Sequence, residues 1–324
     1  MYTAEQYREE FVSYLESRIK PREPSNLYAP ISYILGLGGK RLRPVLTLMT
    51  AEVFGADSSK ALNAALAVEI FHNFSLVHDD IMDAAPLRRG QMTVHEKWDL
   101  NTGILSGDAM LILAYQLFES YDDLTFRSLA QLFSKTALEV CEGQQYDIDF
   151  ASRNDVTIAE YLKMISYKTA VLVAAAMKMG AIIAGASGKS QQGIYIFGLN
   201  LGIAFQLQDD YLDVFGDPKA FGKQLGGDII ENKKTFLFLK ALELATVGQK
   251  EQLQQLFVTQ PQDPLHKVQM VKAIFRDSGA ARRTKEEIAT YTEKAFSILE
   301  VLEIAQANKD SLRAFGEQLM GREV

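Results

Sequence analysis

Residues 61–80 read ALNAALAVEIFHNFSLVHDD. The large apolar side chains recur every three or four positions, at Leu62, Leu66, Ile70, Phe74 and Val77. This spacing lines up one apolar stripe on an α-helix, whereas a half-buried strand would alternate with a period of two. The stretch therefore predicts a largely buried helix that carries two aspartates at its end.

The same helical pattern continues outward along the chain. Similar apolar stripes recur at 109–118, 129–140, 161–184 and 195–212, and the alternation of strands is not evident at length. All eight prolines lie outside 87–217, and because proline costs a helix interior ~3 kcal/mol, long helices are permitted there. Gly- and Pro-rich breaks fall at 36–44, 85–90, 185–193 and 215–228, and two or three more amphipathic helices are expected beyond Pro264. No linker divides the chain, so we predict a single all-α domain over residues 1–324.

The composition excludes several classes of protein. With 324 residues, of which 48% are hydrophobic and 23% charged, the chain can bury a sizeable core. Its net charge of -7 argues against a nucleic-acid partner. The polar N-terminus does not resemble a signal peptide, and the apolar runs fall short of the ~20 residues that span a bilayer. The single cysteine, Cys141, excludes an intrachain disulfide and is expected to be a small core residue. We therefore expect a cytoplasmic protein without a membrane span.

One acidic motif, DDxxD, occurs twice. It is formed first by Asp79, Asp80 and Asp83 and again by Asp209, Asp210 and Asp213. On a helix the first and last aspartates lie one turn apart, with roughly 5 to 6 Å between their Cβ atoms. Each cluster could simply be a solvated helix end, but both follow apolar segments, and uncompensated buried charges are costly. Carboxylates without nearby cysteine or paired histidine favour a hard divalent cation, and Mg2+ is commonly held by a few carboxylates together with substrate phosphates.

Basic residues stand in the breaks beside these motifs. Lys40, Arg41 and Arg43 lie in GGKRLRP, and Arg88 and Arg89 follow the first aspartate cluster. Guanidinium groups bind phosphate bidentately, and neighbouring glycines let the backbone approach an anion. Each cluster alone could be a solvated basic loop. In an acidic protein with two metal-type motifs, they predict a pocket that binds polyanionic phosphates between arginines and metal ions.

Six segments appear in the order typical of one family. They are GGKRLRP, HDDIMDAAPLRRG, EGQ at 142–144, YKT at 167–169, FQLQDDYLDVFGD and GKQLGGDIIENKKT. Over positions 36–236 the chain resembles the trans-prenyl diphosphate synthases, which include farnesyl and geranylgeranyl diphosphate synthases. The resemblance implies a helical bundle of the isoprenoid synthase type with a central cavity, three Mg2+ ions per active site and a homodimer. It also implies condensation of isopentenyl diphosphate with allylic prenyl diphosphates.

The resemblance also implies a role for each matching residue. Asp79 and Asp83 would hold two Mg2+ ions and Asp209 a third, with Asp80, Asp210 and Asp213 in support. The allylic diphosphate would contact Arg88, Lys168 and Lys223, while isopentenyl diphosphate would contact Lys40, Arg43, His72 and Arg89. Gln206 and the backbone around Lys168 and Thr169 would face the reacting carbon skeleton, so the resemblance implies a catalytic role for these three residues. Lys233 matches a further lysine of the last motif, although the neighbouring Lys234 leaves that register open.

The length of the product is expected to depend on two phenylalanines. Phe74 lies five residues before Asp79, ~7.5 Å along the helix, and Phe71 lies ~12 Å along it. Either ring can form a floor beneath the growing tail, or both can simply pack against neighbouring helices. We expect products of C15 to C20, with geranylgeranyl diphosphate favoured over farnesyl diphosphate. The alternatives are a terpene cyclase, which holds a single substrate diphosphate, and a non-catalytic subunit of a heteromeric prenyl synthase.

Overall fold

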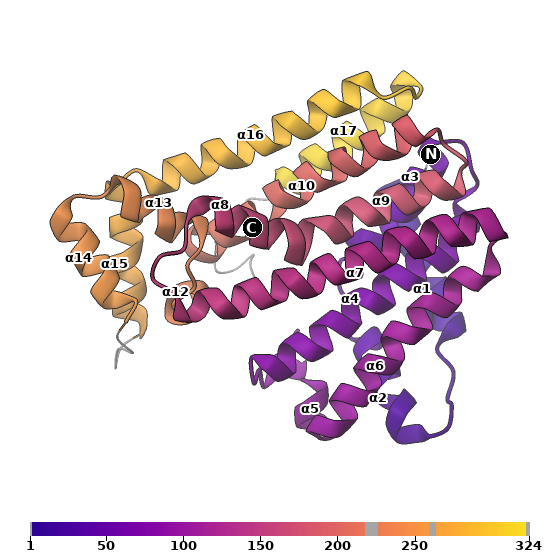
Figure 1. Ribbon diagram of the computed structural model, residues 1–324, viewed down its shortest axis with the longest axis horizontal. Coiled ribbons are helices and arrows are strands. Elements are labelled where there is room, and N and C mark those ends of the chain that lie inside the picture. Colours follow the sequence, from indigo (N-terminus) through magenta and orange to yellow (C-terminus); the bar gives the residue numbers. More distant parts are fainter. Residues whose placement is uncertain (1, 218–225, 259–263, 322–324) are drawn as a thin grey trace. The chain divides into compact units, whose positions relative to one another are not determined.

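The computed structural model describes residues 2–217, 226–258 and 264–321. Nearly all regular structure in these ranges is helical, which confirms the predicted all-α class (Figure 1). The first part of the chain forms α1 (Ala4–Arg18), α2 (Ser25–Gly36), α3 (Leu42–Val53), η1 (Ser58–Ala61), α4 (Leu62–Met82), the strands β1 (Leu87–Arg88) and β2 (Gln91–Met92), α5 (Val94–Lys97), α6 (Leu100–Gln116) and η2 (Leu117–Ser120).

The remaining helices lie beyond residue 122, and the first of them coincide with the predicted apolar stripes at 129–140, 161–184 and 195–212. They are α7 (Asp123–Ser152), α8 (Ile158–Ile165), the π-helix η3 (Ser166–Ala170), α9 (Val171–Ile183), α10 (Gly188–Phe215), α12 (Gly227–Ile230), α13 (Phe236–Leu244), α14 (Val247–Leu256), α15 (Pro264–Asp277), α16 (Ala280–Val301) and α17 (Gln306–Met320). The tail beyond Pro264 forms three helices, as expected. The breaks at 36–44 and 185–193 separate α2 from α3 and α9 from α10.

Local sequence signals fix where several helices begin. Thr3 and Thr157 form capping boxes at α1 and α8 with Gln6 and Glu160, which satisfies backbone N–H groups that lack a partner within the helix. Asp99 caps α6 by accepting a hydrogen bond from the backbone N–H of Thr102 at 2.8 Å. These boundaries are therefore encoded by neighbouring residues, without help from distant parts of the chain.

The chain forms two compact units. The first comprises Met1–Lys135 and Ala175–Gln192, and the second comprises Thr136–Ala174 and Gly193–Val324. The first DDxxD motif belongs to the first unit and the second motif to the second unit. The proposal of a single domain over 1–324 stays a prediction.

Helix α4 is the central element of the first unit. It contacts α1, α2, α3, α5 and α6, and most of its length from Ala64 to Val77 is buried. Glycines permit the closest approaches: a Cβ at Gly107 of α6 would come within 2.2 Å of His78 Nε2, and one at Gly180 within 2.4 Å of Thr47 O. The contact at Gly107 packs α6 closely against the C-terminal part of α4, which carries the aspartates.

The second unit is built around an apolar core shared by α8, α10, α13, α15 and α16. Tyr161, Leu207, Leu237 and Phe275 are among its almost fully buried members. Helix α17 packs closely as well, because Gly316 lies against Phe296 of α16 and Leu201 of α10. The core therefore supports α10 along the stretch that carries the second aspartate motif.

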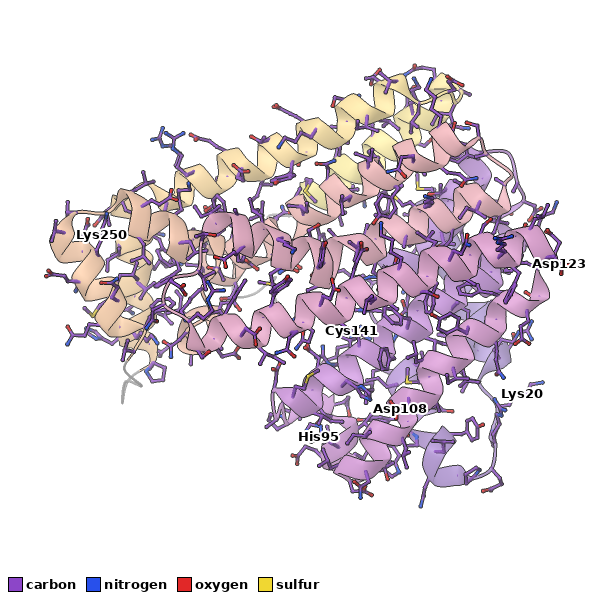
Figure 2. All side chains as sticks on the ribbon, in the orientation of Figure 1. Lys20, His95, Asp108, Asp123, Cys141 and Lys250 are labelled. Carbon is purple, nitrogen blue, oxygen red and sulfur yellow. The ribbon has the colours of Figure 1, made fainter. Side chains whose placement is uncertain are left out.

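Cys141 corrects one expectation from the sequence. The buried stripe of α7 runs through Leu129, Phe133, Thr136, Val140 and Gly143, and position 141 falls one residue off it. The side chain is exposed, and its position along α7 is labelled in Figure 2. It is therefore a surface thiol and not a core residue.

One stretch of the described chain, Ile158–Ile183, is long and apolar enough to cross a membrane by length and hydropathy. Its most apolar window is 72% buried within the protein. Burial on that scale is typical of a core helix, so hydropathy alone is weak support for a span.

Candidate active site

The first aspartate motif lies at the C-terminal end of α4. Asp79 and Asp80 occupy its last turn, and Asp83 ends the helix with its backbone N–H donating to Asp79 O at 2.9 Å. Asp80 is buried, Asp79 is half-buried and Asp83 is exposed. The motif therefore presents Asp79 and Asp83 outward on one face, while Asp80 points into the protein.

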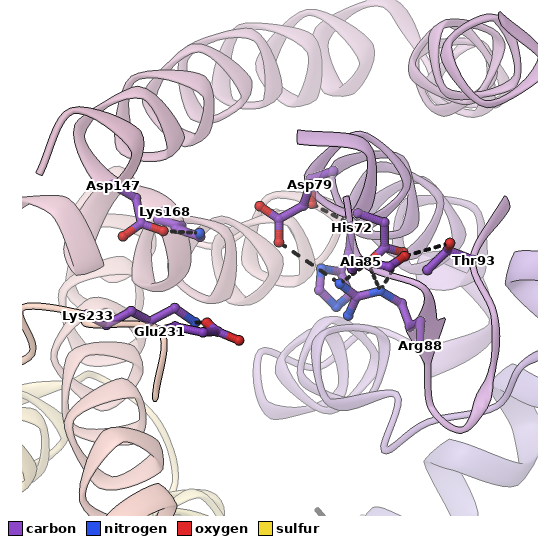
Figure 3. Close-up of polar contacts among 11 residues, drawn as sticks. His72, Asp79, Ala85, Arg88, Thr93, Asp147, Lys168, Glu231 and Lys233 are labelled. Carbon is purple, nitrogen blue, oxygen red and sulfur yellow. Dashed lines mark hydrogen bonds and ion pairs between the residues drawn. The ribbon is translucent and has the colours of Figure 1, made fainter. Parts of the chain in front are cut away.

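Arg88 compensates the buried carboxylate of Asp80. Its Nε donates to Asp80 Oδ1 and Oδ2 at 2.9 and 2.8 Å, and its Nη2 donates to Oδ1 at 2.7 Å. Nη2 also lies 4.0 Å from Asp79 Oδ2 (Figure 3). Charge-assisted bonds of this kind are strong, so Arg88 is held beside the first motif with its guanidinium turned toward both aspartates.

A hairpin of two short strands positions both arginines of the LRRG segment. Leu87 opposes Met92 and Arg88 opposes Gln91, so the two-residue turn consists of Arg89 and Gly90. Both turn residues have positive φ, 53° and 74°, which a type I′ turn requires. Thr93 Oγ1 donates to Ala85 O at 2.8 Å and closes the loop at its base (Figure 3). The hairpin therefore sends Arg88 toward α4 and places Arg89 at its tip.

Arg89 reaches the turn between α2 and α3. Its guanidinium donates to Gly38 O and lies so close to Gly39 that a Cβ there would meet it at 2.9 Å. Gly39 has φ +124°, a conformation that L side chains rarely adopt. Lys40 on this turn is exposed, and Arg43 in the first turn of α3 is half-buried. The glycines therefore let an arginine from another element join the basic residues of GGKRLRP.

His72 on α4 lies within the field of these cations. Burial, followed by the charges of Arg43, Arg89 and Arg88, holds the pKa of the His72 ring well below its ordinary value. The ring is neutral at neutral pH and can offer one donor and one acceptor nitrogen. We call Lys40, Arg43, His72, Arg88 and Arg89 the basic cluster. Arg43, His72, Arg88 and Arg89 come together in the first unit, and Lys40 is exposed on the turn between α2 and α3.

The second aspartate motif lies on α10 and is tied into a hydrogen-bonded chain. Thr169 Oγ1 donates to Gln206 Oε1 at 3.0 Å, and Gln206 Nε2 donates to Asp210 Oδ1 at 2.9 Å. The buried Tyr161 hydroxyl donates to Asp210 Oδ2. Burial and the nearby charge of Asp228 raise the pKa of the Asp210 carboxyl well above its ordinary value. The structure thus joins Thr169, Gln206 and Asp210, which are spread over more than forty positions of the sequence.

Lys168 and Thr169 lie on the π-helix between α8 and α9. This segment is packed between two glycines: a Cβ at Gly143 would meet the Lys168 backbone N at 2.2 Å, and one at Gly202 would meet Ala170 Cα at 2.8 Å. Lys168 Nζ donates to Asp147 Oδ2 at 2.5 Å (Figure 3). Single-turn π segments are frequent at functional sites. In this π turn, Lys168 points toward Asp147 of α7, and Thr169 points toward Gln206 of α10.

A group of charged residues near the second aspartate motif completes the candidate site in the second unit. It consists of Asp213, Asp228 and Lys233. Asp213 Oδ2 accepts a hydrogen bond from the backbone N–H of Asp228 at 3.1 Å. Burial and the charge of Asp228 raise the pKa of Asp213 to about 6, and burial raises that of Asp228 itself. Lys233 Nζ lies 3.3 Å from Asp228 Oδ1 and 2.8 Å from Glu231 Oε2 (Figure 3). These carboxylates repel one another and are only partly compensated.

The structure also separates the two neighbouring lysines of the last motif. Lys233 faces the carboxylates, whereas Lys234 Nζ donates to Phe150 O at 2.8 Å and Ala151 O at 3.2 Å at the end of α7. A lysine that binds the last carbonyls of a helix has a local structural task. Lys233 is therefore the lysine of the pair that lies beside Asp228, and its match to the last motif stays a prediction. Lys223 lies outside the described residues.

Phe71 and Phe74 belong to an aromatic cluster below the first motif. Phe71 is fully buried and lies 5.4 Å from Phe74 and 5.1 Å from Phe133, measured between ring centroids. Phe133 in turn contacts Phe118 and Tyr115 at 5.2 and 4.7 Å. Phe71 therefore packs against α7, while Phe74, at 8% exposure, contacts Phe71 and His78 of its own helix and is the nearer of the two to the aspartates.

The aspartates of the two motifs can be compared with the ligands that a hard cation such as Mg2+ requires. Within the described ranges, no three His, Cys, Asp or Glu side chains gather closely enough to hold a metal ion by themselves. Asp79 and Asp83 nevertheless present oxygen atoms one turn apart, and the second motif contains carboxylates with raised pKa values. This set fits Mg2+, which keeps several waters and is usually bound by one or two carboxylates plus substrate phosphates.

The sequence analysis did not identify several residues that contact the candidate site in the second unit. Asp147 lies four residues after Gly143 and so shares its helical face, and Asp228 follows the GG of the last motif; these spacings were available signals. Tyr161 had none, because a tyrosine on an apolar stripe is indistinguishable from an ordinary core residue. Its role as a donor to Asp210 depends on the packing of α8 against α10.

Comparisons with known proteins identify a family for the chain. A family model described as "Polyprenyl synthetase" matches residues 24–274. Geranylgeranyl pyrophosphate synthase from Geoglobus acetivorans is 38% identical over 300 residues, which cover 89% of each chain. Geranylfarnesyl diphosphate synthase from Natronomonas pharaonis is 40% identical over 253 residues, covering 72% of this chain and 74% of that one. A crystal structure of a geranylgeranyl pyrophosphate synthase is 55% identical, covers 100% of both chains and superposes with a TM-score of 0.96.

Proposed function

The chain belongs to the polyprenyl synthetase family, and on this premise we propose that it condenses isopentenyl diphosphate with allylic diphosphates to give mainly a C20 product, geranylgeranyl diphosphate. It is a prenyltransferase of isoprenoid biosynthesis. The observation that carries the specific proposal is the completeness of the machinery: two intact aspartate motifs and, beside the first, a basic cluster that provides more cations than one diphosphate requires.

Mg2+ is the metal that the site would hold, as is general in this family. We propose three ions per active site, two at Asp79 and Asp83 and one at Asp209, with Asp80, Asp210 and Asp213 in support. When bound, the ions supply positive charge that stabilises diphosphate as a leaving group. Asp80 contributes indirectly, because its hydrogen bonds hold Arg88 in place. Asp210 likewise orients Gln206.

The reaction begins with loss of diphosphate from the allylic substrate. Arg88, Lys168, Lys233 and, by resemblance, Lys223 would bind that diphosphate and stabilise the charge that develops on it. The allylic cation that remains would face Thr169 and Gln206, whose oxygen atoms carry partial negative charge and are held in one orientation by their mutual hydrogen bond. The apolar cavity that the family resemblance implies would exclude water, which would otherwise quench the cation.

The second substrate would be held by Lys40, Arg43, His72 and Arg89. His72 is neutral because its pKa is lowered, so it can donate a hydrogen bond to a diphosphate oxygen without requiring acid pH. The double bond of isopentenyl diphosphate attacks the cation, a new carbon–carbon bond forms and a proton leaves to generate the alkene. The released diphosphate is the base that we propose for this proton.

We further propose a homodimer and a cytoplasmic location. Helix α6 exposes Leu105 and Ile112, each 59% accessible and seven residues apart, together with Leu100 and Ile104. Two turns of a helix separate Leu105 from Ile112, so these two apolar side chains share one face of α6. Exposed apolar faces of this kind mark interaction surfaces, and a second copy of the chain is the partner that the family resemblance implies.

A condensation assay tests the proposed function. Purified protein is incubated with Mg2+, isopentenyl diphosphate and dimethylallyl, geranyl or farnesyl diphosphate, and the products are separated by chain length. We expect a C20 product, at least a ~100-fold loss for Asp79→Ala and Asp209→Ala, and no effect of Asp310→Ala, an exposed aspartate of α17. A cyclised hydrocarbon made without isopentenyl diphosphate would indicate a terpene cyclase. Turnover in excess chelator would refute the role of the metal.

A further inference from the structure

Arg41 differs from the other cations of GGKRLRP because it points into the protein. Its side chain is 4% exposed and forms an ion pair with Glu69 of α4, whose side chain is 3% exposed. A second guanidinium nitrogen donates to Leu35 O in the last turn of α2. Asn73, one turn along α4, donates to Glu69 Oε1 at 3.1 Å and to Glu69 O at 2.8 Å. The guanidinium is therefore committed to the protein and is not directed at a ligand.

This network joins three elements at the point where the basic cluster forms. Arg41 is the N-cap residue of α3 and has φ 49°, in the left-handed region, which costs energy for a non-glycine residue. Its neighbours in sequence are Lys40 and Leu42, and Arg43 follows in the first turn of α3. On α4, Glu69 and Asn73 flank His72. The ion pair thus fixes the turn that bears Lys40 and Arg43 against the helix that bears His72.

We propose that the buried Arg41–Glu69 pair is a positioning unit for the binding site of isopentenyl diphosphate. It sets the geometry of the basic cluster without contacting the substrate. The charge of Glu69 has a second effect, because it raises the pKa of Arg89 and so opposes the lowering caused by burial and by the charges of Arg41 and Arg88. The inference rests on the proposed function of that cluster.

The expected effect is selective for one substrate. Misplacement of a binding group by about 1 Å can cost roughly 100-fold. Arg41→Lys keeps the positive charge but loses the planar guanidinium, which donates to Glu69 and to Leu35 O at the same time. Glu69→Gln keeps the shape of the side chain but loses its negative charge. Each variant should raise KM for isopentenyl diphosphate by roughly 10- to 100-fold, while KM for the allylic diphosphate changes less than about threefold, because Arg88 and Asp80 are untouched.

A double-mutant cycle separates positioning from direct binding. If the residues act as a pair, Arg41→Lys/Glu69→Gln should be no worse than the more affected single variant. A large effect at Arg41 with none at Glu69 would overturn the proposal, because it would make Arg41 a direct ligand. The double variant Arg41→Met/Glu69→Leu replaces the pair by apolar side chains, which often preserves stability. If this variant unfolds at the wild-type temperature and keeps the wild-type KM for isopentenyl diphosphate, the pair has no positioning role.

Calorimetric titration with isopentenyl diphosphate alone makes the test independent of turnover. A wild-type protein that does not condense the substrates would refute the proposed function. If that protein still binds isopentenyl diphosphate and the Arg41 and Glu69 variants bind it at least ~10-fold more weakly, the positioning role stands. Equal binding by wild type and both single variants would refute the positioning role. Arg8→Gln, which breaks an exposed arginine–glutamate pair on α1, is the matched control and should leave binding unchanged.

Discussion

His72 is the residue whose protonation the structure constrains most directly. Its pKa is lowered by burial first and by Arg43 next, so the ring should remain neutral well below pH 6.5, its ordinary value. Replacing Arg43 by glutamine removes the largest charge contribution, and we expect the pKa of His72 to rise. The four histidines can be followed by NMR, with His72→Gln to assign the signal. An unchanged His72 titration in Arg43→Gln would show that burial alone sets the pKa.

The same shift has a consequence for stability. Because the pKa of His72 is lower in the folded than in the unfolded state, the folded protein binds fewer protons at acid pH. The contribution of His72 to stability is therefore fully present above the unfolded pKa of about 6.5 and is lost as the pH falls below that value. In urea unfolding between pH 8 and pH 5.5, the wild type should lose more stability than His72→Gln. Equal losses would contradict a buried neutral ring.

Phe74 is expected to limit product length. Removing its ring opens space between the aspartates and the aromatic cluster, so Phe74→Ala should make longer products than the wild type. Phe71 lies deeper and supports Phe133, so Phe74→Ala/Phe71→Ala should lengthen the product further but cost roughly 3–5 kcal/mol of stability. Products are separated by chain length, with thermal unfolding as a check on the fold. Phe126→Ala, at a 38% exposed position, should change nothing. An unchanged product in an active double variant would place the stop on another helix.

At the scale of elements, the π-helix depends on the absence of a side chain at Gly143. A Cβ there would lie 2.2 Å from the backbone N of Lys168, and backbone atoms cannot move aside as a flexible side chain can. We predict that Gly143→Ala costs roughly 1–3 kcal/mol of stability and lowers kcat, because the π turn that positions Lys168 and Thr169 must shift. Chemical denaturation and steady-state kinetics measure the two effects.

Gly248 provides the matched control for that substitution. It is the second residue of α14, and a Cβ there would meet nothing within 4 Å, so Gly248→Ala should leave activity unchanged and should not lower stability. If Gly143→Ala behaves like Gly248→Ala, the π turn does not depend on close packing against α7.

The elements themselves were largely predictable, but two local conformations were not. The apolar stripes located α4, α7, α9 and α10 because helical periodicity is written in consecutive residues. The π turn at 166–170 left no such mark, since it results from the close contacts with Gly143 and Gly202 on other helices. For the hairpin around Arg89 and Gly90, the sequence predicted only a break between helices. Strands of two residues are too short to show the alternation of apolar and polar side chains by which a strand is recognised.

At the scale of the whole molecule, the apolar face of α6 is predicted to hold two copies together. Placing charges on it, in Leu105→Glu/Ile112→Glu, should convert the dimer into a monomer, because both side chains would be desolvated in the interface. Light scattering after size exclusion measures the mass. Val247→Glu, at a 74% exposed position of α14, should remain dimeric. A wild-type monomer at the assay concentration would refute the proposed dimer.

The sequence by itself determined the helical class, the helix starts set by Thr3, Asp99 and Thr157, and the two aspartate motifs, because each depends on residues within a few positions of one another. Only the tertiary structure decided which way neighbouring side chains of the same type point. Arg41 points into the protein while Lys40 is exposed, because the partners of the Arg41 guanidinium are Glu69 on α4 and the Leu35 carbonyl on α2. Lys234 binds the end of α7 while Lys233 faces Asp228. In a loop no periodicity assigns a face, so the partners brought by distant elements decide it.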